Sequence, residues 1–272
     1  ILKNKLILYF SVSYENHQLS FYFISTWLFS QDSIQTNFVK KIRIEQNQLA
    51  AIDNFGNYYF TDLNTIAKQV KTNEFIYNNM QLGEISSIDA FNALKTTVFY
   101  RDFNTVIILD NRLSEIMKID FNQNVPFRNI SHVSTGYDTT IWCFNQETQE
   151  LELFDYRNKT TRVKSFPVND NAIAMISNYN TCWLLTENYL YHYNYFGSLL
   201  KKIAHDGFTS MRESDGNLIL KKDEFLHYLD TTTELMTPIQ DHNLLIKQFF
   251  VTNETLYIYD DEFLHQYQLI KE

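Results

Sequence analysis

Residues 98–110 read VFYRDFNTVIILD, two short runs of β-formers separated by the polar turn RDFN. The sequence continues with NRLSEIMKIDF, so a second turn that opens at Asp110 leads into another strand. Short apolar runs joined by turns rich in Asn and Asp are typical of antiparallel β-structure. The stretch decides the fold if the same unit recurs along the chain.

This unit does recur. Full copies follow at residues 141–166, 182–203 and 218–239, and partial copies lie at 58–70 and 256–268. Each copy is preceded by one more short strand, which gives a repeat of four strands. The residues that open the third strand of each repeat are Asn64, Asn104, Gln149, Asn188, Glu224 and Glu262, at steps of 40, 45, 39, 36 and 38. Six repeats of this length predict a β-propeller.

The two ends of the repeat array complement each other. The last repeat stops at Glu272 directly after its third strand, whereas a spare strand, Asn37–Ile44, precedes the first repeat. If the spare strand completes the last repeat, it closes the ring and covers a sheet edge. The predicted fold class is therefore all-β: a six-bladed β-propeller of four-stranded antiparallel blades, closed by the N-terminal strand, which completes the last blade. A sandwich of unrelated hairpins leaves both features unexplained.

Composition narrows the classes of partner. The chain has 272 residues and a formal net charge of −9, and no segment concentrates Lys and Arg. Nucleic acids and anionic membrane surfaces are therefore disfavoured, because binding to phosphates depends on basic side chains. Cys143 and Cys182 form no CxxC pair, and we expect both to stay unpaired. We expect a monomer without a transmembrane span or a cofactor.

The first thirty residues differ from the rest. Leu19–Ser30 is an uncharged apolar run with the length of a signal-peptide core and is too short to span a bilayer. We expect residues 1–30 to be a signal-peptide-like or disordered segment and residues 31–272 to form a single propeller. An exported protein, periplasmic or extracellular, follows from this interpretation. A buried strand pair is the alternative for residues 1–30, and it would fit an intracellular scaffold.

The blade pattern over Asn37–Glu272 resembles the six-bladed propellers of the NHL and TolB-like type, and in style the small exported propellers of Bacteroidetes-like bacteria. Neither the WD dipeptide nor a kelch double glycine occurs. Six-bladed propellers include metal-dependent lactonases with an Asp, Asn and Glu set around an ion. Asp89, Asn178 and Glu213 are candidates for such a set, but acids and Asn are so common in this chain that finding them carries almost no information, and we predict no metal site.

Propeller ligands usually sit at the mouth of the central channel, near the loops that join blades and the turns between second and third strands. We therefore predict a mostly acidic channel mouth. The residues in these turns that we predict to bind a ligand are Asp62, Arg101, Asp102, Glu147, Glu187, Lys222 and Asp261. The alternative is that they form an ordinary solvated face.

Motifs for catalysis are missing from the sequence. No GxSxG elbow, P-loop or dinucleotide fingerprint occurs, so we predict no catalytic residue. His227 and His265 share a position in the repeated EFLH, but a metal site needs further ligands and repeat ancestry explains the match. The aromatic run Asn188–Phe196 could stack on sugars, but packing between blades requires the same residues.

Two functions remain open on this sequence. The first is a non-catalytic exported propeller that acts as a binding or protein-interaction platform, with a protein, small molecule or glycan as partner. The second is a metal-dependent hydrolase, lactonase-like, or a lyase, with its site at the mouth of the channel. They differ in whether three or more carboxylate, Asn or His side chains converge there.

Overall fold

A computed structural model describes residues 33–45, 48–123 and 125–270, all within the compact unit formed by residues 31–272. The signal-peptide-like segment predicted for residues 1–30 lies outside the described residues. Among the residues described, no helix is both long and apolar enough to cross a membrane.

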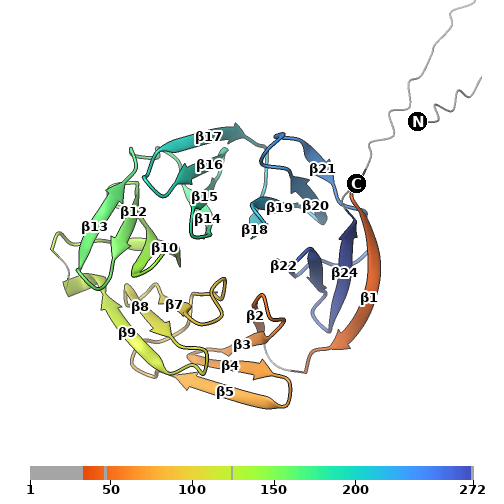
Figure 1. Cartoon of the computed structure of the whole chain (residues 1–272), viewed down its shortest axis with the longest axis horizontal. Helices are drawn as coiled ribbons and strands as arrows, with labels where there is room; N and C mark the ends of the chain where they lie inside the picture. Colours follow the sequence, from red (N-terminus) through yellow and green to blue (C-terminus); the bar gives the residue numbers. More distant parts are fainter. Residues whose placement is uncertain (1–32, 46–47, 124, 271–272) are drawn as a thin grey trace, which may run out of the picture. The chain divides into compact units, whose positions relative to one another are not determined.

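Six four-stranded antiparallel sheets are arranged as blades in a ring (Figure 1). The first blade contains β2 (Gln48–Ile52), β3 (Tyr58–Asp62), β4 (Thr65–Val70) and β5 (Asn73–Asn78). The second contains β6 (Ser87–Asp89), β7 (Thr96–Tyr100), β8 (Thr105–Leu109) and β9 (Glu115–Asp120), followed by a short 3-10 helix at Phe121–Gln123. The third contains β10 (Ile130–Thr135), β11 (Thr140–Asn145), β12 (Glu150–Asp155) and β13 (Thr160–Lys164).

The second half of the chain repeats this plan. The fourth blade contains β14 (Ala172–Ser177), β15 (Thr181–Thr186), β16 (Tyr189–Asn194) and β17 (Leu199–Ala204). The fifth contains β18 (Ser210–Ser214), β19 (Asn217–Lys222), β20 (Phe225–Leu229) and β21 (Met236–Pro238). The sixth contains β22 (Gln248–Thr252), β23 (Thr255–Tyr259), β24 (Phe263–Ile270) and β1 (Gln35–Arg43). The predicted six-bladed propeller is confirmed.

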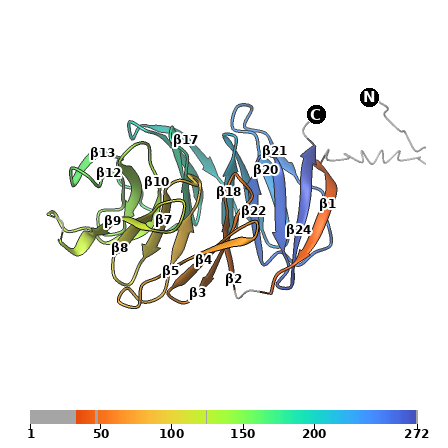
Figure 2. The same cartoon turned by 60° about the horizontal axis from the view of Figure 1, so that its bottom comes forward.

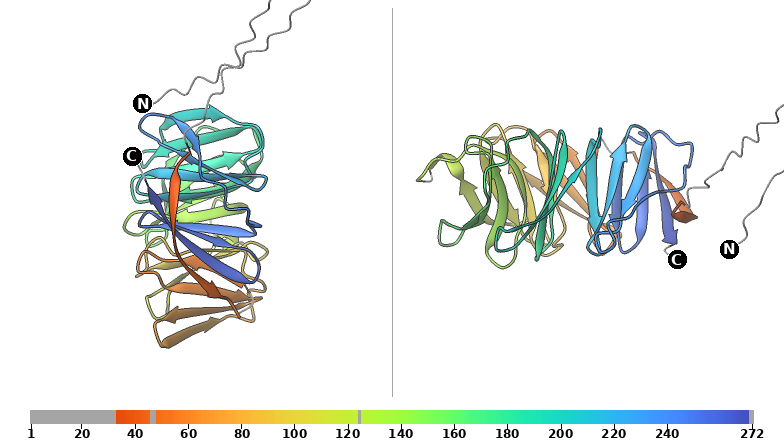
Figure 3. Two further views of the ribbon diagram at one scale, coloured as in Figure 1. Left: turned by 90° about the vertical axis from the view of Figure 1, so that its right-hand side faces the viewer. Right: turned by 90° about the horizontal axis from the view of Figure 1, so that it is seen from above.

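The N-terminal strand closes the ring as predicted. β1 pairs antiparallel with β24 from Gln35 opposite Ile270 to Arg43 opposite Phe263, with a bulge between Phe38 and Lys40. Figure 2 and the left panel of Figure 3 show β1 beside the last strands of the chain. The pairing gives β24 a neighbouring strand on each side, so neither edge of β24 is left unpaired where the ring closes.

The hydrophobic core is divided into layers between adjacent blades. Ile141 and Cys143 of the third blade pack with Phe99 and Val106 of the second, and equivalent clusters lie between the other neighbours. The cluster that contains Leu49 joins the last blade to the first. Burial of a large aliphatic or aromatic side chain contributes about 1.5–3 kcal/mol, so these layers hold the blades together.

Strand ends follow the predicted turn chemistry. The six residues predicted to open the third strands each lie one residue before an observed third strand. Asp110, where the sequence predicts a turn, and Asp230, at the equivalent place in the fifth blade, each accept a hydrogen bond from the backbone amide two residues further on. Because Asx turns do not require glycine, the chain can reverse direction many times although it contains only 6 glycines.

Both cysteines are free and buried, as expected. Burial also raises the pKa of the Cys143 and Cys182 thiols well above the ordinary value. The aromatic run packs between blades: Tyr191 and Tyr193 belong to the layer between the third and fourth blades. His192, on the other face of β16, stacks on Trp183 with ring centroids 3.8 Å apart.

Candidate functional site

The innermost strands of the six blades surround a central channel of about 620 Å³. Because every blade repeats one strand order, these strands all begin at one end of the channel and finish at the other. We call these the link end, where loops arrive from the preceding blade, and the turn end, where each innermost strand turns into the second strand. Strands β10, β14, β18 and β22 can be followed around the channel in Figure 1.

One of the seven predicted ligand-binding residues reaches the channel. Arg101 lines it near the link end, where its backbone N–H donates to Ser86 Oγ at 3.0 Å. The other six do not belong to the residues that line the channel; they lie on the turns between second and third strands: Asp62, Asp102, Glu147, Glu187, Lys222 and Asp261. Whether these turns bind a ligand stays a prediction.

Local contacts account for several of the six. Lys222 forms an ion pair with Asp206 at 2.9 Å, and Glu187 accepts a hydrogen bond from Asn171 at 3.1 Å. Asp261 has a backbone φ of 92° and accepts a hydrogen bond from the Tyr259 hydroxyl through its carbonyl. These contacts hold Lys222, Glu187 and Asp261 on their own blades, outside the lining of the channel.

The turn end of the channel has most of its charged side chains. Asp89, at the end of β6, accepts hydrogen bonds through Oδ2 from Ser134 Oγ at 2.7 Å and from the Thr135 N–H at 2.8 Å. Its Oδ1 accepts one from the Phe91 N–H at 2.9 Å. This carboxylate therefore fastens the second blade to the third.

Glu213, on β18, also binds across a blade boundary. Its Oε1 accepts hydrogen bonds from Asn178 Nδ2 at 3.1 Å and from the Gly216 N–H at 2.8 Å. Burial raises the pKa of the Glu213 carboxyl, and these two hydrogen bonds offset the effect only in part. Oε2 takes no hydrogen bond within the part of the chain described.

The three residues that match the metal-binding set of lactonases are only partly suited to a metal ion: Asp89, Asn178 and Glu213. Asp89 and Glu213 both line the channel, and Asn178 is bonded to Glu213. However, Asn178 Oδ1 already accepts hydrogen bonds from the backbone amides of Asn180 and Thr181, both at 2.9 Å. An amide oxygen engaged in this way is poorly placed to bind an ion. Among residues 33–45, 48–123 and 125–270, no three His, Cys, Asp or Glu side chains form a group that could hold one.

The two histidines of the repeated EFLH occupy equivalent places on β20 and β24. His227 lies opposite Leu220, and His265 lies opposite Ile258, in adjacent blades. Their surroundings differ, because His265 Nε2 bonds Asp260 Oδ2 at 2.7 Å whereas His227 packs edge-on against Phe208. Neither lines the channel.

Arg212 is the channel residue that the sequence analysis missed. It lies on β18, and its side chain lines the channel. A signal was present in the sequence: the segment SMRES puts an arginine in an innermost strand, where the other repeats have small or apolar residues at the centre.

Fold and site together define a six-bladed β-propeller with an open, mixed apolar and polar central channel. No protein-family model matches the sequence, and a search of curated proteins gives no match.

Solved structures of similar shape do exist. A streptogramin B lyase superposes with a TM-score of 0.61 and 12% identity, over 86% of this chain and 88% of that one. The virginiamycin B lyase of Staphylococcus aureus gives a TM-score of 0.59 and 10% identity, over 88% of this chain and 96% of that one. A chain of the mitotic checkpoint complex gives 0.57 and 10%, over 98% of this chain and all of its own length (100%). At such identities the likeness shows the propeller fold alone.

Proposed function

We propose that this protein is a non-catalytic, exported β-propeller that acts as a protein-interaction platform. On the pattern of strands and turns in its repeats, we place it with the NHL and TolB-like propellers and with small exported propellers of Bacteroidetes-like bacteria. The observation that carries the interaction role is a group of exposed apolar side chains on the loops at the link end of the first three blades.

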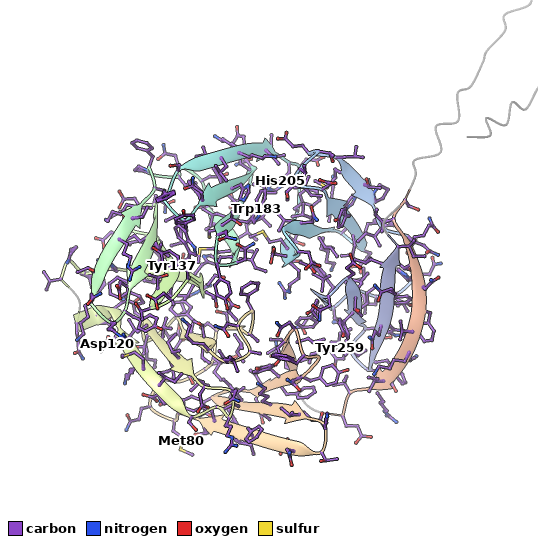
Figure 4. All side chains as sticks on the ribbon, in the orientation of Figure 1. Met80, Asp120, Tyr137, Trp183, His205 and Tyr259 are labelled. Carbon is purple, nitrogen blue, oxygen red and sulfur yellow. The ribbon has the colours of Figure 1, made fainter. Side chains whose placement is uncertain are left out.

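We call this group the apolar loop surface. Its members come from two turns and two blade links, with side chains 45–94% exposed: Leu63, Met80, Phe103, Val125 and Phe127. Met80 projects from the ring in Figure 4. Clusters of large exposed apolar side chains mark interaction sites more often than single ones do.

Contacts between neighbouring loops connect the segments that carry some of these side chains. The link around Gly83 lies against Phe103, because a Cβ built on Gly83 would be 3.2 Å from the ring. The Ile85 N–H donates to the Leu63 carbonyl at 2.9 Å, and Asn122 Nδ2 donates to the Phe103 carbonyl at 2.9 Å. Two blade links therefore pack against the turns between second and third strands, and the apolar side chains of these segments are exposed.

Photo-crosslinking in the cells that produce the protein tests this role. A benzophenone amino acid is placed at Phe127 and, as matched control, at Phe196, which is 64% exposed at the turn end of the fourth blade. We expect a discrete adduct from position 127 that disappears in Met80→Ser, and none from position 196. Equal adducts at both positions, or none from 127, would contradict the proposal. Fractionation of the same cells tests export.

A channel enzyme, either a hydrolase or a lyase, is the second candidate. The observation in its favour is Glu213, whose raised pKa and free Oε2 would suit a general acid or base. A metal-dependent form predicts a divalent ion in the native mass spectrum that a chelator removes. A mass equal to the chain alone, with and without chelator, would count against the metal-dependent form.

A further inference from the structure

Arg212 has few partners for a charged group in the middle of a protein. Its Nη1 donates to the Met211 carbonyl at 2.9 Å, and this is its one hydrogen bond within the described part of the chain. Over the same residues it forms no ion pair within 4.0 Å. A guanidinium has five N–H donors, so four remain for a molecule in the channel.

Two aromatic rings lie near the guanidinium. Its central carbon lies 5.6 Å from the ring centroid of Phe249 and 5.4 Å from that of Phe250 on the neighbouring blade. These rings fix the position of the cation without satisfying its N–H groups. Burial lowers the pKa of Arg212, and the charge of Asp89 raises it in return.

Asp89 does not serve as the hydrogen-bonded counterion of Arg212. Both of its oxygens already accept hydrogen bonds from the second and third blades, and it acts on Arg212 only through its charge. Arg212 is half-buried, and a partly desolvated charge without a hydrogen-bonded counterion is unfavourable. An anionic group inside the channel would remove this penalty.

The channel has the size and lining of a small-molecule site. Its volume of about 620 Å³ lies within the range of 300–1,000 Å³ that is usual for such sites. Apolar side chains from three innermost strands line it beside the polar groups, among them Ile52, Ile176 and Val251. At the turn end Phe91 and Tyr179, from the second and fourth blades, touch edge-to-face with ring centroids 5.1 Å apart.

We propose that the central channel binds a small organic carboxylate, whose anionic group pairs with Arg212 and whose apolar part lies against β14 and β22. A monoanion suits the site better than a phosphate, because Asp89 and Glu213 line the same channel and would repel a second negative charge. A planar carboxylate also matches the paired N–H groups of a guanidinium. This site is separate from the apolar loop surface and does not depend on it.

Isothermal titration calorimetry of the full chain tests the proposal by measuring the affinity for each probe. The probes are phenylbutyrate and the straight-chain fatty acids from butyrate to decanoate, each compared with its neutral amide. We expect saturable binding of at least one carboxylate, at least tenfold tighter than its amide. No saturable binding across the series, or equal affinity for acid and amide, overturns the proposal.

Two variants locate the site. Arg212→Gln should weaken binding of that carboxylate at least tenfold, whereas Arg112→Gln, the same change at an exposed arginine that does not line the channel, should leave it unchanged. The same loss in both variants would overturn the assignment to Arg212. If Arg212→Gln does not fold, Ile176→Phe replaces it as the test variant. Ile176→Phe narrows the apolar part of the channel and should therefore shift the preference toward acids with shorter chains. If the ranking of affinities by chain length is the same as in the wild type, the proposal is overturned.

Discussion

Phe38, near the beginning of the described chain, packs edge-to-face on Tyr267, near its end, with ring centroids 5.7 Å apart. The contact belongs to the β1 and β24 ladder, in which Phe38 and Tyr267 are direct cross-strand partners. Closure of the ring therefore depends on residues more than two hundred positions apart, because β1 covers the edge of β24 that would otherwise be unpaired.

Deletion of residues 35–43 should destabilise the propeller far more than deletion of residues 1–30. The first change removes the eight residue pairs of the β1 and β24 register and exposes an edge of β24. With each lost hydrogen bond costing about 0.5–1.5 kcal/mol, the free energy of unfolding should fall by at least about 4 kcal/mol. Urea unfolding of both variants measures this, and equal tolerance of the two deletions would contradict the closure.

The fold could be predicted from sequence because its signals are local and repeat. The side chains of Asp110 and Asp230 accept backbone hydrogen bonds that form turns, so these turns can be recognised from the residue type. Short runs of β-forming residues between such turns indicate the strands. A regular spacing then predicts blades, and a spare strand at one end predicts how they close. Each step requires only the order of residues along the chain.

The channel was predicted less well, for two physical reasons. Membership of a turn between second and third strands does not decide whether a side chain reaches the channel, since Arg101 lines it whereas Asp62 and Asp102 do not. Bulges also interrupt the innermost strands β2, β10 and β14 and reset the alternation of their side chains. Which residues of these three strands face the channel therefore follows from backbone geometry that the sequence pattern does not reveal.

Glu152→Gln should cost about 3 kcal/mol of unfolding free energy, because it leaves Arg128 buried without its counterion. The Arg128 Nε to Glu152 Oε2 distance is 2.9 Å, and both side chains are at most 5% exposed. Glu150→Gln is the matched control: Glu150 is on the same strand and pairs with the half-exposed Lys164, so its loss should cost well under about 1 kcal/mol. Equal effects in denaturant titrations would show that burial of the pair is unimportant.

The Glu152 pair should also depend on pH. Burial alone would raise the pKa of Glu152, but hydrogen bonds from Thr161 and Arg128 and the charge of Arg128 lower it below its ordinary value of 4.5. A carboxyl with a lowered folded-state pKa stabilises the protein above its unfolded-state pKa and loses that effect as the pH falls through the folded-state value. The stability difference between wild type and Glu152→Gln should therefore be constant above about pH 5 and shrink below it. A difference that grows on acidification would contradict this.

His192 should make the protein less stable in mild acid. Burial lowers the pKa of His192 to about 4, and its ring nitrogens have no hydrogen-bond partner within the described chain. Between the unfolded-state value of 6.5 and about 4, the unfolded chain binds the proton and the folded one does not, so stability falls as the pH falls through this window. After allowance for solvent screening the effect should be about 1–2 kcal/mol.

His192→Phe keeps a ring that can stack on Trp183 and removes the titrating group. Thermal unfolding of the variant and the wild type at pH 7 and pH 4.5 should show a smaller drop in Tm for the variant. If both lose the same stability on acidification, the buried imidazole is not responsible.

Gly197 should tolerate a side chain much less well than Gly56, although both have a positive φ, of 75° and 77°. A Cβ on Gly197 would lie 2.2 Å from Val163 Cγ1 and 3.2 Å from the Lys164 carbonyl oxygen, whereas nothing lies within 4 Å of one on Gly56. Gly56→Ala therefore measures the backbone strain alone, about 1–2 kcal/mol. Gly197→Ala adds a clash between the third and fourth blades and should cost at least about 1 kcal/mol more. Chemical denaturation of the two variants decides the matter: equal losses would mean that the fourth blade can move away from Val163 without cost, and that packing between these blades is looser than the contacts imply.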